Sequence, residues 1–111
     1  MPLNVSIITV TFNSAATVKE TMRSVSEQDY PFIEHIIVDG QSQDDTLKIV
    51  HSFSHTALVV CEKDDGIYDA MNKGIRASRG DIVGMLNSDD IYAHPEVISH
   101  IVKAFEDDSV Q

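Results

Sequence analysis

The chain has 111 residues, of which 42% are hydrophobic and 23% charged. This composition is typical of one globular domain and excludes a disordered chain. The formal net charge at pH 7 is −10, which argues against nucleic acid as a partner, because binding to phosphate backbones needs clustered Lys and Arg. No apolar run approaches the ~18 residues of a bilayer-spanning helix, and no signal peptide is apparent. We therefore expect a cytoplasmic protein, or one peripheral to the inner face of the membrane, without a transmembrane segment.

Short runs rich in β-branched residues alternate with stretches of helical periodicity. The expected strands cover residues 5–12, 35–39, 56–62 and 80–86. Asn13 and Ser14 can cap the first helix, Ser42 and Asp44 the second, and Pro95 suits the first turn of the fourth. The apolar positions of the four helices are Ala15, Val18, Met22 and Val25, then Leu47, Val50 and Phe53, then Ile67, Ala70, Met71, Gly74 and Ile75, and last Ile98, Ile101, Val102 and Phe105.

This alternation predicts an α/β fold, with a parallel sheet and helices on both of its faces. In such sheets, ligands bind beyond the carboxyl ends of the strands. Three of the four predicted strand ends carry aspartates, at Asp39, within residues 62–66 and within residues 87–90. The pattern therefore concentrates negative charge on the edge where a ligand is expected.

The single cysteine, Cys61, excludes an internal disulfide. Its apolar neighbours in "ALVVCEK" predict a buried structural thiol. The five histidines show no metal-ligand spacing, so we expect them to be surface or packing residues.

Residues 84–92, "GMLNSDDIY", place Asp89 and Asp90 after the fourth predicted strand. The glycine-rich loops that cradle phosphates are missing from the sequence. A Mn²⁺ or Mg²⁺ ion held by carboxylates is the remaining common way to bind a phosphorylated ligand. The alternative is an acidic turn that caps the following helix, and these residues alone do not decide between the two.

Three other polar positions each have two interpretations. Asp39 could accept a hydrogen bond from an imide N–H of a base such as uracil, or could simply be a polar strand end. Asp65 could border a ligand, or could only favour the N-terminus of the third helix electrostatically. Lys73 could neutralise a phosphate, or could be an ordinary exposed helical lysine.

The order of these signals is more specific than any one of them. The segment from Val5 to Thr46, then "DDGIYDAMNKGI", then "ASRGDIVGMLNSDDIY" resembles the N-terminal half of family 2 glycosyltransferases, from about Val5 to Phe105. The resemblance implies the GT-A fold, a Rossmann-like domain that binds a nucleotide-diphosphate sugar with Mn²⁺ or Mg²⁺. It also implies transfer of the sugar, normally UDP-linked, to an acceptor hydroxyl with inversion, in polysaccharide or surface glycan biosynthesis.

The resemblance also suggests a role for each motif. Thr11, Phe12 and Asn13 would line the base pocket, and Asp39 would bind the base. The nucleotide would be bordered by Asp65, Gly66, Asn72 and Lys73. In the D-x-D motif, Ser88 would lie near the ribose and diphosphate, and the metal ligands would be Asp89 and Asp90.

Two positions depart from the family pattern. Gly40 stands where a second Asp often follows the second strand, and Asn87 stands where the D-x-D motif often begins. Asn87 lacks a charge, so we expect Asp89 to bear most of the metal binding.

The expected domain spans residues 1–111 and binds the donor. The acceptor-binding half and the general base that deprotonates the acceptor are expected downstream of Gln111. The acceptor itself would be a glycan or a lipid-linked molecule, and a homodimer could cover an exposed sheet edge. One rival is a non-catalytic module that binds nucleotide, metal or another protein. A second, a phosphoryl-transfer enzyme of the acid-phosphatase type, needs Asp-x-Asp after the first strand, where the chain has "TFN".

Overall fold

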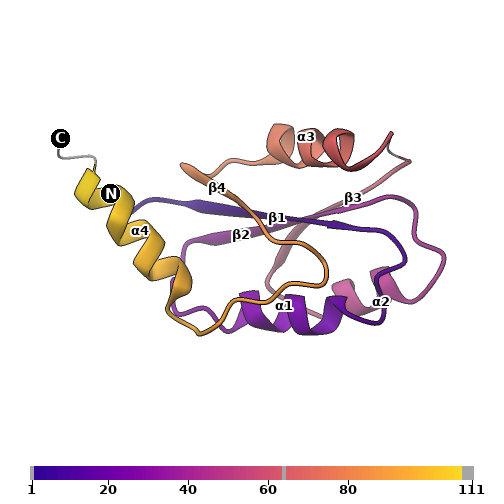
Figure 1. Cartoon of the computed structure of the whole chain (residues 1–111), viewed down its shortest axis with the longest axis horizontal. Helices are drawn as coiled ribbons and strands as arrows, with labels where there is room; N and C mark the ends of the chain where they lie inside the picture. The colour runs from indigo at the N-terminus through magenta and orange to yellow at the C-terminus, as the bar shows by residue number, and fades with distance from the viewer. Residues whose placement is uncertain (1, 64, 109–111) are drawn as a thin grey trace.

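The computed structural model describes residues 2–63 and 65–108. Within them, one parallel sheet contains β1 (Val5–Thr11), β2 (Ile33–Asp39), β3 (Thr56–Cys61) and β4 (Ile82–Met85). The spatial order is β3-β2-β1-β4, so β1 and β2 lie in the middle (Figure 1). The predicted α/β class with a parallel sheet is confirmed.

Helices cover both faces of this sheet, as predicted. Helices α1 (Val18–Ser26) and α2 (Thr46–His51) lie on one face, and α3 (Ile67–Ala77) lies on the other (Figure 1). Helix α4 (Val97–Asp108) lies at the end of the molecule where β1 begins. Among the described residues, no helix is long and apolar enough to cross a bilayer.

The strand boundaries differ by one or two residues from the predicted ones. Phe12 and Glu62 lie just beyond the ends of β1 and β3. Strand β4 begins at Ile82 rather than residue 80, because the backbone N–H groups of Asp81 and Ile82 both donate to the carbonyl of Asn4, at 2.7 and 3.1 Å. The chain bends there before it can pair as a regular ladder.

Three of the predicted capping residues, Asn13, Ser14 and Ser42, do not cap a helix with their side chains. Helix α1 begins only at Val18. The Ser14 hydroxyl bonds to Phe12 in the preceding loop, and the Asn13 side-chain oxygen accepts the N–H of Gln43 in the loop after β2. Ser42 likewise does not cap α2, because its hydroxyl bonds to a strand end. Asp44 fits its predicted role, since its carboxylate accepts the backbone N–H of Thr46, the first residue of α2, at 3.0 Å. The hydrogen bond from the Thr46 side chain lowers the pKa of the Asp44 carboxyl.

Strand β1 contributes alternate side chains to two separate cores. Ile7 packs in a core between the sheet, α1 and α4, whose buried members also include Val5, Val25, Ile82, Leu86, Ile98 and Val102. Its neighbour Ile8 packs on the opposite face with Ile36, Val38 and Ala70. Both isoleucines are 1% exposed. This alternation is what a central strand between two helical layers requires.

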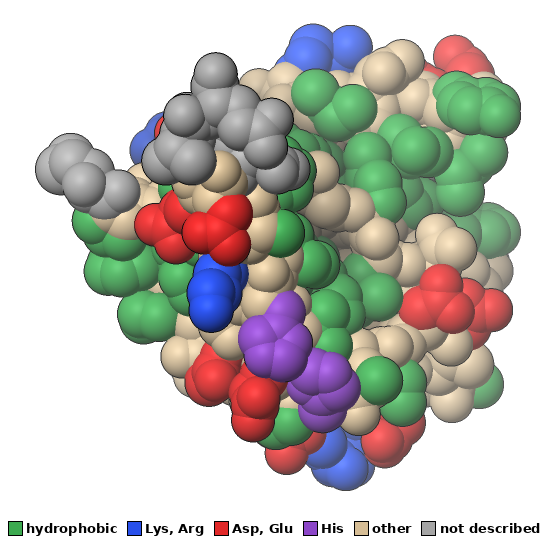
Figure 2. Space-filling view, turned by 60° about the vertical axis from the view of Figure 1, so that its left-hand side comes forward, with side chains coloured by type: hydrophobic (Ala, Val, Ile, Leu, Met, Phe, Trp, Pro, Cys, Tyr) green, Lys and Arg blue, Asp and Glu red, His purple; other side chains and the backbone are tan. Residues whose placement is uncertain are grey.

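The outer face of α4 keeps part of its apolar surface in contact with solvent. Ile101 is 38% exposed and Phe105 51% exposed. Figure 2 brings this end of the molecule forward and shows hydrophobic side chains spread across the face, with the acidic groups interspersed.

The contact between α3 and the sheet is made by small residues. Ala70 and Gly74 are the buried residues of this helix. The buried face of α3 is thus narrower than the predicted apolar face, since Ile67 and Ile75 are 54% and 48% exposed. A Cβ atom added to Gly74 would lie 2.5 Å from Cγ2 of Ile8 and 3.1 Å from its Cδ1. The close approach of α3 to β1 therefore depends on the absence of a side chain at Gly74.

We expect Gly74→Ala to destabilise the fold by roughly 1–3 kcal/mol, because the buried, β-branched Ile8 has little room to yield. In an unconstrained helix, the same change would stabilise by up to about 1 kcal/mol. The free energy of unfolding in urea shows whether Gly74→Ala destabilises or stabilises the fold. Arg76→Ala, at an exposed position of α3, is the matched control and should change stability by less than about 0.5 kcal/mol. A more stable Gly74→Ala variant would contradict the packing argument.

A pair of histidines joins β2 to the turn that precedes β3, with His35 in the strand and His55 in the turn. His35 is fully buried, and its Nε2 lies 2.9 Å from the hydroxyl of Thr9 while its Nδ1 lies 3.0 Å from Nε2 of His55. Burial, followed by the proximity of His55, lowers the pKa of His35 to about 3. Burial also lowers the pKa of His55. His35 is thus a packing residue, as expected.

This pair makes the stability depend on pH. Below pH 6.5, His35 takes up a proton in the unfolded chain but not in the folded one, so its contribution to stability is fully present above pH 6.5 and falls as the pH drops toward 3. We expect the loss from His35 to reach about 2 kcal/mol at pH 5. Urea unfolding at pH 7.5 and pH 5 measures it. His35→Leu should reduce this difference, whereas His51→Gln, at an exposed position, should leave it unchanged. An unaltered difference in His35→Leu would show that other groups cause it.

Candidate functional site

The candidate site lies at the carboxyl ends of the strands. The loops that follow β1, β2 and β3 gather at the end of the molecule opposite α4 (Figure 1). These loops carry the predicted base-binding residues and the start of α3. The turn after β4 lies on the other side of β1, because β1 separates β4 from β2.

The carboxylate of Asp39 is the centre of the first group. Asp39 is fully buried, and its Oδ1 accepts hydrogen bonds from the hydroxyls of Thr11 and Ser42, both at 2.6 Å. Its Oδ2 accepts the backbone N–H of Ser42 at 2.7 Å and the thiol of Cys61 at 3.8 Å. A buried carboxylate needs such donors, since an unpaired charge is costly away from water. Asp39 therefore joins the ends of β1, β2 and β3.

The loop after β1 is held against the loop after β2. The backbone N–H of Asn13 donates to the Ser42 hydroxyl at 2.8 Å, and the Asn13 side-chain oxygen accepts the N–H of Gln43 at 2.8 Å. Asn13 adopts a left-handed conformation with φ of 47°, which Asn tolerates better than most residues. Phe12, between this residue and β1, is 62% exposed. The structure thus brings Thr11, Asn13 and Asp39 together, and Phe12 presents its ring to solvent beside them.

The exposed position of Cys61 overturns the expected buried thiol. Cys61 is the last residue of β3, and β3 is an edge strand with one neighbour. Apolar neighbours in the sequence therefore do not bury its side chain. Its register partner on β2 is Asp39.

The third strand end contains the acidic and basic groups that precede and enter α3. Gly66, the N-cap of α3, has a φ of 103°, which favours glycine. The exposed Asp65 donates its backbone N–H to Asp69 at 2.9 Å. Asn72 is exposed on the second turn of the helix.

Lys73 is already engaged by acidic groups. Its Nζ lies 3.2 Å from Glu62 and 3.3 Å from Asp69, and it donates to the carbonyl of Lys63 at 2.7 Å. Desolvation alone would lower the pKa of Lys73, but the hydrogen bonds to Glu62 and Asp69 outweigh it and raise the pKa. The interpretation of Lys73 as an ordinary exposed lysine is wrong, since 13% of its side chain is accessible. Glu62 and Asp69 therefore largely balance the charge of Lys73 in the absence of a phosphate ligand.

The residues of the D-x-D region form a tight turn after β4. The backbone N–H of Asp90 donates to the carbonyl of Asn87 at 3.0 Å, and Asp89 and Asp90 are both exposed. This turn does not cap the next helix, because α4 begins only at Val97. The helix-capping explanation of these acids is therefore excluded.

Helix α1 holds this turn in place through Thr21. The buried Thr21 hydroxyl lies 3.0 Å from the carbonyl of Ser88 and 2.6 Å from that of Asp90. The backbone on both sides of Asp89 is thus bonded to one side chain, which leaves the carboxylate of Asp89 on the outside of the turn.

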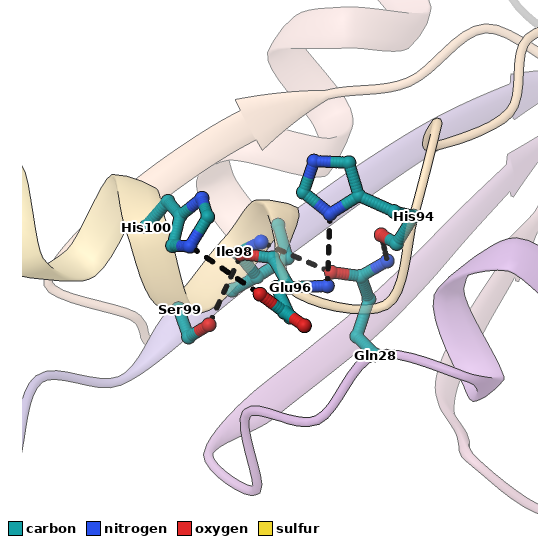
Figure 3. Close-up of polar contacts among 6 residues, drawn as sticks. All are labelled: Gln28, His94, Glu96, Ile98, Ser99 and His100. Carbon is teal, nitrogen blue, oxygen red and sulfur yellow. Dashed lines mark hydrogen bonds and ion pairs between the residues drawn. The ribbon is translucent and has the colours of Figure 1, made fainter.

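Gln28 makes a second attachment further along the same segment. Its side-chain amide donates to the carbonyls of Ser24 and His94, at 3.2 and 2.9 Å, and accepts the backbone N–H of Ile98 at 3.0 Å. Figure 3 shows Gln28 pointing between His94 and the start of α4. The rings of His94 and His100 pack edge-on nearby, with centroids 5.7 Å apart (Figure 3).

A pocket of about 280 Å³ lies between α1 and residues 91–95. Arg23, Glu27 and Tyr92 are among its lining residues, and burial raises the pKa of Tyr92 to about 12. The pocket adjoins the acidic turn but contains none of the predicted nucleotide-binding residues.

The metal prediction rests on few carboxylates. Among the residues that the structure describes, no group of three or more His, Cys, Asp or Glu side chains is arranged to hold a metal ion. Asp89 and Asp90 supply the hard oxygen donors that Mn²⁺ and Mg²⁺ prefer, and these ions commonly take one or two carboxylates plus substrate phosphates. The two side chains therefore fit a metal whose remaining ligands come from a bound diphosphate and water.

Sequence reasoning missed Thr21, Ser42 and Cys61 as partners of the site. Thr21 sits among the apolar positions of α1, where a polar residue is unusual and could have drawn notice. Ser42 follows Asp39 by three residues, a spacing at which an Asp side chain commonly bonds to the following turn, so the local sequence could have indicated this contact. Nothing in the local sequence indicates that Cys61 reaches Asp39, because that contact depends on the pairing of β2 with β3.

Comparison with known proteins matches the chain to glycosyltransferases. An uncharacterised glycosyltransferase of Mycobacterium tuberculosis is 39% identical over 102 residues, which cover 90% of this chain and 39% of that protein. The structure of Staphylococcus aureus TarS (residues 1–349) in complex with UDP-GlcNAc superposes with a TM-score of 0.86 at 28% identity, over 96% of this chain and 32% of the other. The Pyrobaculum calidifontis mannosyltransferase PcManGT, in complex with GDP-Man and Mn²⁺, superposes with a TM-score of 0.84 at 29% identity, over 93% and 32%.

The match extends over nearly the whole chain. The family model described as Glycosyl transferase family 2 covers residues 6–111. The chain spans about 39% of the length of the first curated relatives it matches. These matches confirm the resemblance and the GT-A fold expected from the motifs, and the chain belongs to glycosyl transferase family 2.

Proposed function

We propose that this chain is the donor-binding part of a glycosyltransferase that takes a sugar from a nucleotide-diphosphate sugar. The observation that carries the proposal is the cluster of Thr11, Asn13 and Asp39 beside the exposed Phe12, at the strand ends where ligands bind in such sheets. The TarS structure contains UDP-GlcNAc, and by similarity we assign a UDP-linked donor to this chain.

The base would bind against Phe12 and Asp39. An aromatic ring that is 62% exposed can stack on a base without repacking the core. The Asp39 carboxylate would accept a base N–H, which selects bases that carry such a group. Asp65, Gly66 and Asn72 would border the nucleotide at the start of α3, and Lys73 would contribute a charge that Glu62 and Asp69 already partly balance.

The diphosphate would depend on a divalent cation. The net charge of the chain is −10, and Lys73, which would border the nucleotide, is bonded to two acids. Asp89 would be the principal metal ligand, with Asp90 beside it and Ser88 near the ribose and diphosphate. A bound Mn²⁺ or Mg²⁺ would supply positive charge to a diphosphate leaving group. The likeness to PcManGT, whose structure contains GDP-Man and Mn²⁺, supports this assignment.

The whole protein would transfer the sugar to a hydroxyl of a glycan or a lipid-linked acceptor, with inversion, in polysaccharide or surface glycan biosynthesis. The general base would lie outside the 111 residues, so the chain alone would bind the donor without turning it over. We further propose a cytoplasmic location, peripheral to the inner face of the membrane where the acceptor is a lipid, and a homodimer as one way to cover the exposed side chains of β4. Val83 and Met85 of that strand are 42% and 39% exposed.

The second candidate is a non-catalytic interaction module. It is favoured by the absence of a three-residue metal cluster from the described part of the chain. Calorimetry with UDP, with and without Mn²⁺, separates the two. The donor-binding proposal requires UDP binding that strengthens with Mn²⁺ and weakens after chelation, and no binding in either condition leaves the interaction module.

Asp89→Ala should weaken Mn²⁺-dependent UDP binding by about tenfold or more, equivalent to about 1.4 kcal/mol, because the principal metal ligand is lost. The fold should be retained, because the Asp89 carboxylate is exposed and only the adjoining backbone is bonded to Thr21. Calorimetric titration of UDP in Mn²⁺ measures the affinity, and the urea midpoint checks the fold.

Asp107→Ala is the matched control, since this exposed acid lies in α4 at the opposite end of the molecule. It removes the same charge and should leave UDP binding within about twofold of the parent chain. Equal affinity of Asp89→Ala and the parent would show that Asp89 does not hold the metal.

A further inference from the structure

The Asp39 carboxylate has no free acceptor position in this structure. A carboxylate offers about four lone-pair sites on its two oxygens. Oδ1 accepts from Thr11 and from the hydroxyl of Ser42, and Oδ2 accepts from the N–H of Ser42 and from Cys61. A base N–H can therefore reach this carboxylate only if one of the four donors leaves.

The thiol of Cys61 is the donor that leaves most easily. The other three contacts are 2.6–2.7 Å long, whereas the thiol sulfur lies 3.8 Å from Oδ2. A thiol is also a weaker donor than a hydroxyl or an amide. The N–H of Ser42 belongs to the backbone, and the Ser42 hydroxyl also accepts the N–H of Asn13, so moving Ser42 would disturb the loop after β1.

The position of Cys61 also opens toward solvent. Cys61 is exposed at the end of edge strand β3, while Thr11 is 1% exposed and Asp39 is fully buried. Asp39 and Cys61 are register partners across β2 and β3, so their side chains lie on the same face of the sheet. A ligand that approaches Asp39 from the side of β3 meets the thiol first.

We propose that Cys61 limits the affinity for a base with a ring N–H by occupying the Oδ2 position of Asp39 until that N–H displaces it. This inference rests on the proposed function. A base with a ring N–H, such as uracil or guanine, replaces the thiol hydrogen bond with a stronger one. The corresponding ring nitrogen of cytosine carries a lone pair and no hydrogen, so in the same pose it cannot donate to Asp39 and leaves the thiol in place. The thiol therefore lowers the affinity for uracil or guanine but not for cytosine.

Removal of the thiol tests this role. Cys61→Ala should raise the affinity for UDP in Mn²⁺ by about two- to tenfold, because the net contribution of one hydrogen bond is about 0.5–1.5 kcal/mol. The affinity of Cys61→Ala for CDP should stay within about twofold of that of the parent chain, since CDP gains nothing from the vacated position. Cys61→Ser, which keeps a donor at the same position, is the matched control and should gain less than Cys61→Ala. Calorimetry gives the affinities, and urea midpoints show that both variants are folded.

Alkylation of the unaltered chain gives a second, independent measurement. UDP with Mn²⁺ should slow the reaction of Cys61 with iodoacetamide, because the bound base lies over the thiol, and CDP at the same concentration should slow it much less. The role of Cys61 would be overturned if the affinities for UDP and CDP changed equally, if Cys61→Ala gained no affinity for UDP, or if UDP left the alkylation rate unaffected. Each of these outcomes leaves UDP binding itself intact. Failure of the parent chain to bind UDP at all would overturn the proposed function and this inference with it.

Discussion

The buried carboxylate of Asp39 is the constraint on which the rest of the candidate site depends. A charge that is removed from water must be surrounded by donors, and here the donors come from the ends of β1 and β3 and from the loop after β2. Satisfying one carboxylate therefore fixes three strand ends relative to one another. The same arrangement bonds the loops at Asn13 and Ser42 and leaves Phe12 outside.

Helix α1 supplies the complementary constraint on the other side of β1. Thr21 bonds the backbone on both sides of Asp89, and Gln28 bonds the segment before α4. Neither side chain would contact a nucleotide in the proposed function, yet Thr21 holds the turn that carries the acids and Gln28 holds the segment that follows it. The site thus has two rigid halves, one centred on a buried acid and one on exposed acids, and a diphosphate with its cation would join them. Because a cation would lie between the two halves, a chain with a net charge of −10 can still be proposed to bind a phosphorylated ligand.

Much of the fold could be predicted from local patterns. The β-branched runs and helical periodicities identified all four strands and four helices of the described residues, because each pattern reflects burial on one or two faces. The predictions were less accurate for the strand boundaries, for the caps at Asn13 and Ser42 and for the apolar face of α3. Contacts with distant residues decided three of these outcomes: Asn4 sets the start of β4, Gln43 bonds to the Asn13 side chain, and Ile8 packs against Gly74, while Ile67 and Ile75 stay exposed. At Ser42 the deciding contact is local, because the Ser42 hydroxyl bonds to Asp39 three residues before it.

By itself the sequence determined the α/β class, the edge that carries the polar strand ends, and the family, because these depend on the order and spacing of residue types along the chain. Only the tertiary structure decided that Asp39 is saturated by donors, that Cys61 is exposed, that Lys73 is paired with acids, and that Asp89 and Asp90 do not cap a helix. The reason is physical: the bonds from Thr11 and Cys61 to Asp39, 28 and 22 positions apart, arise from the pairing of strands, and the bond from Thr21 to Asp90, 69 positions apart, arises from the packing of a helix on the sheet. No local pattern of residues encodes contacts of this kind.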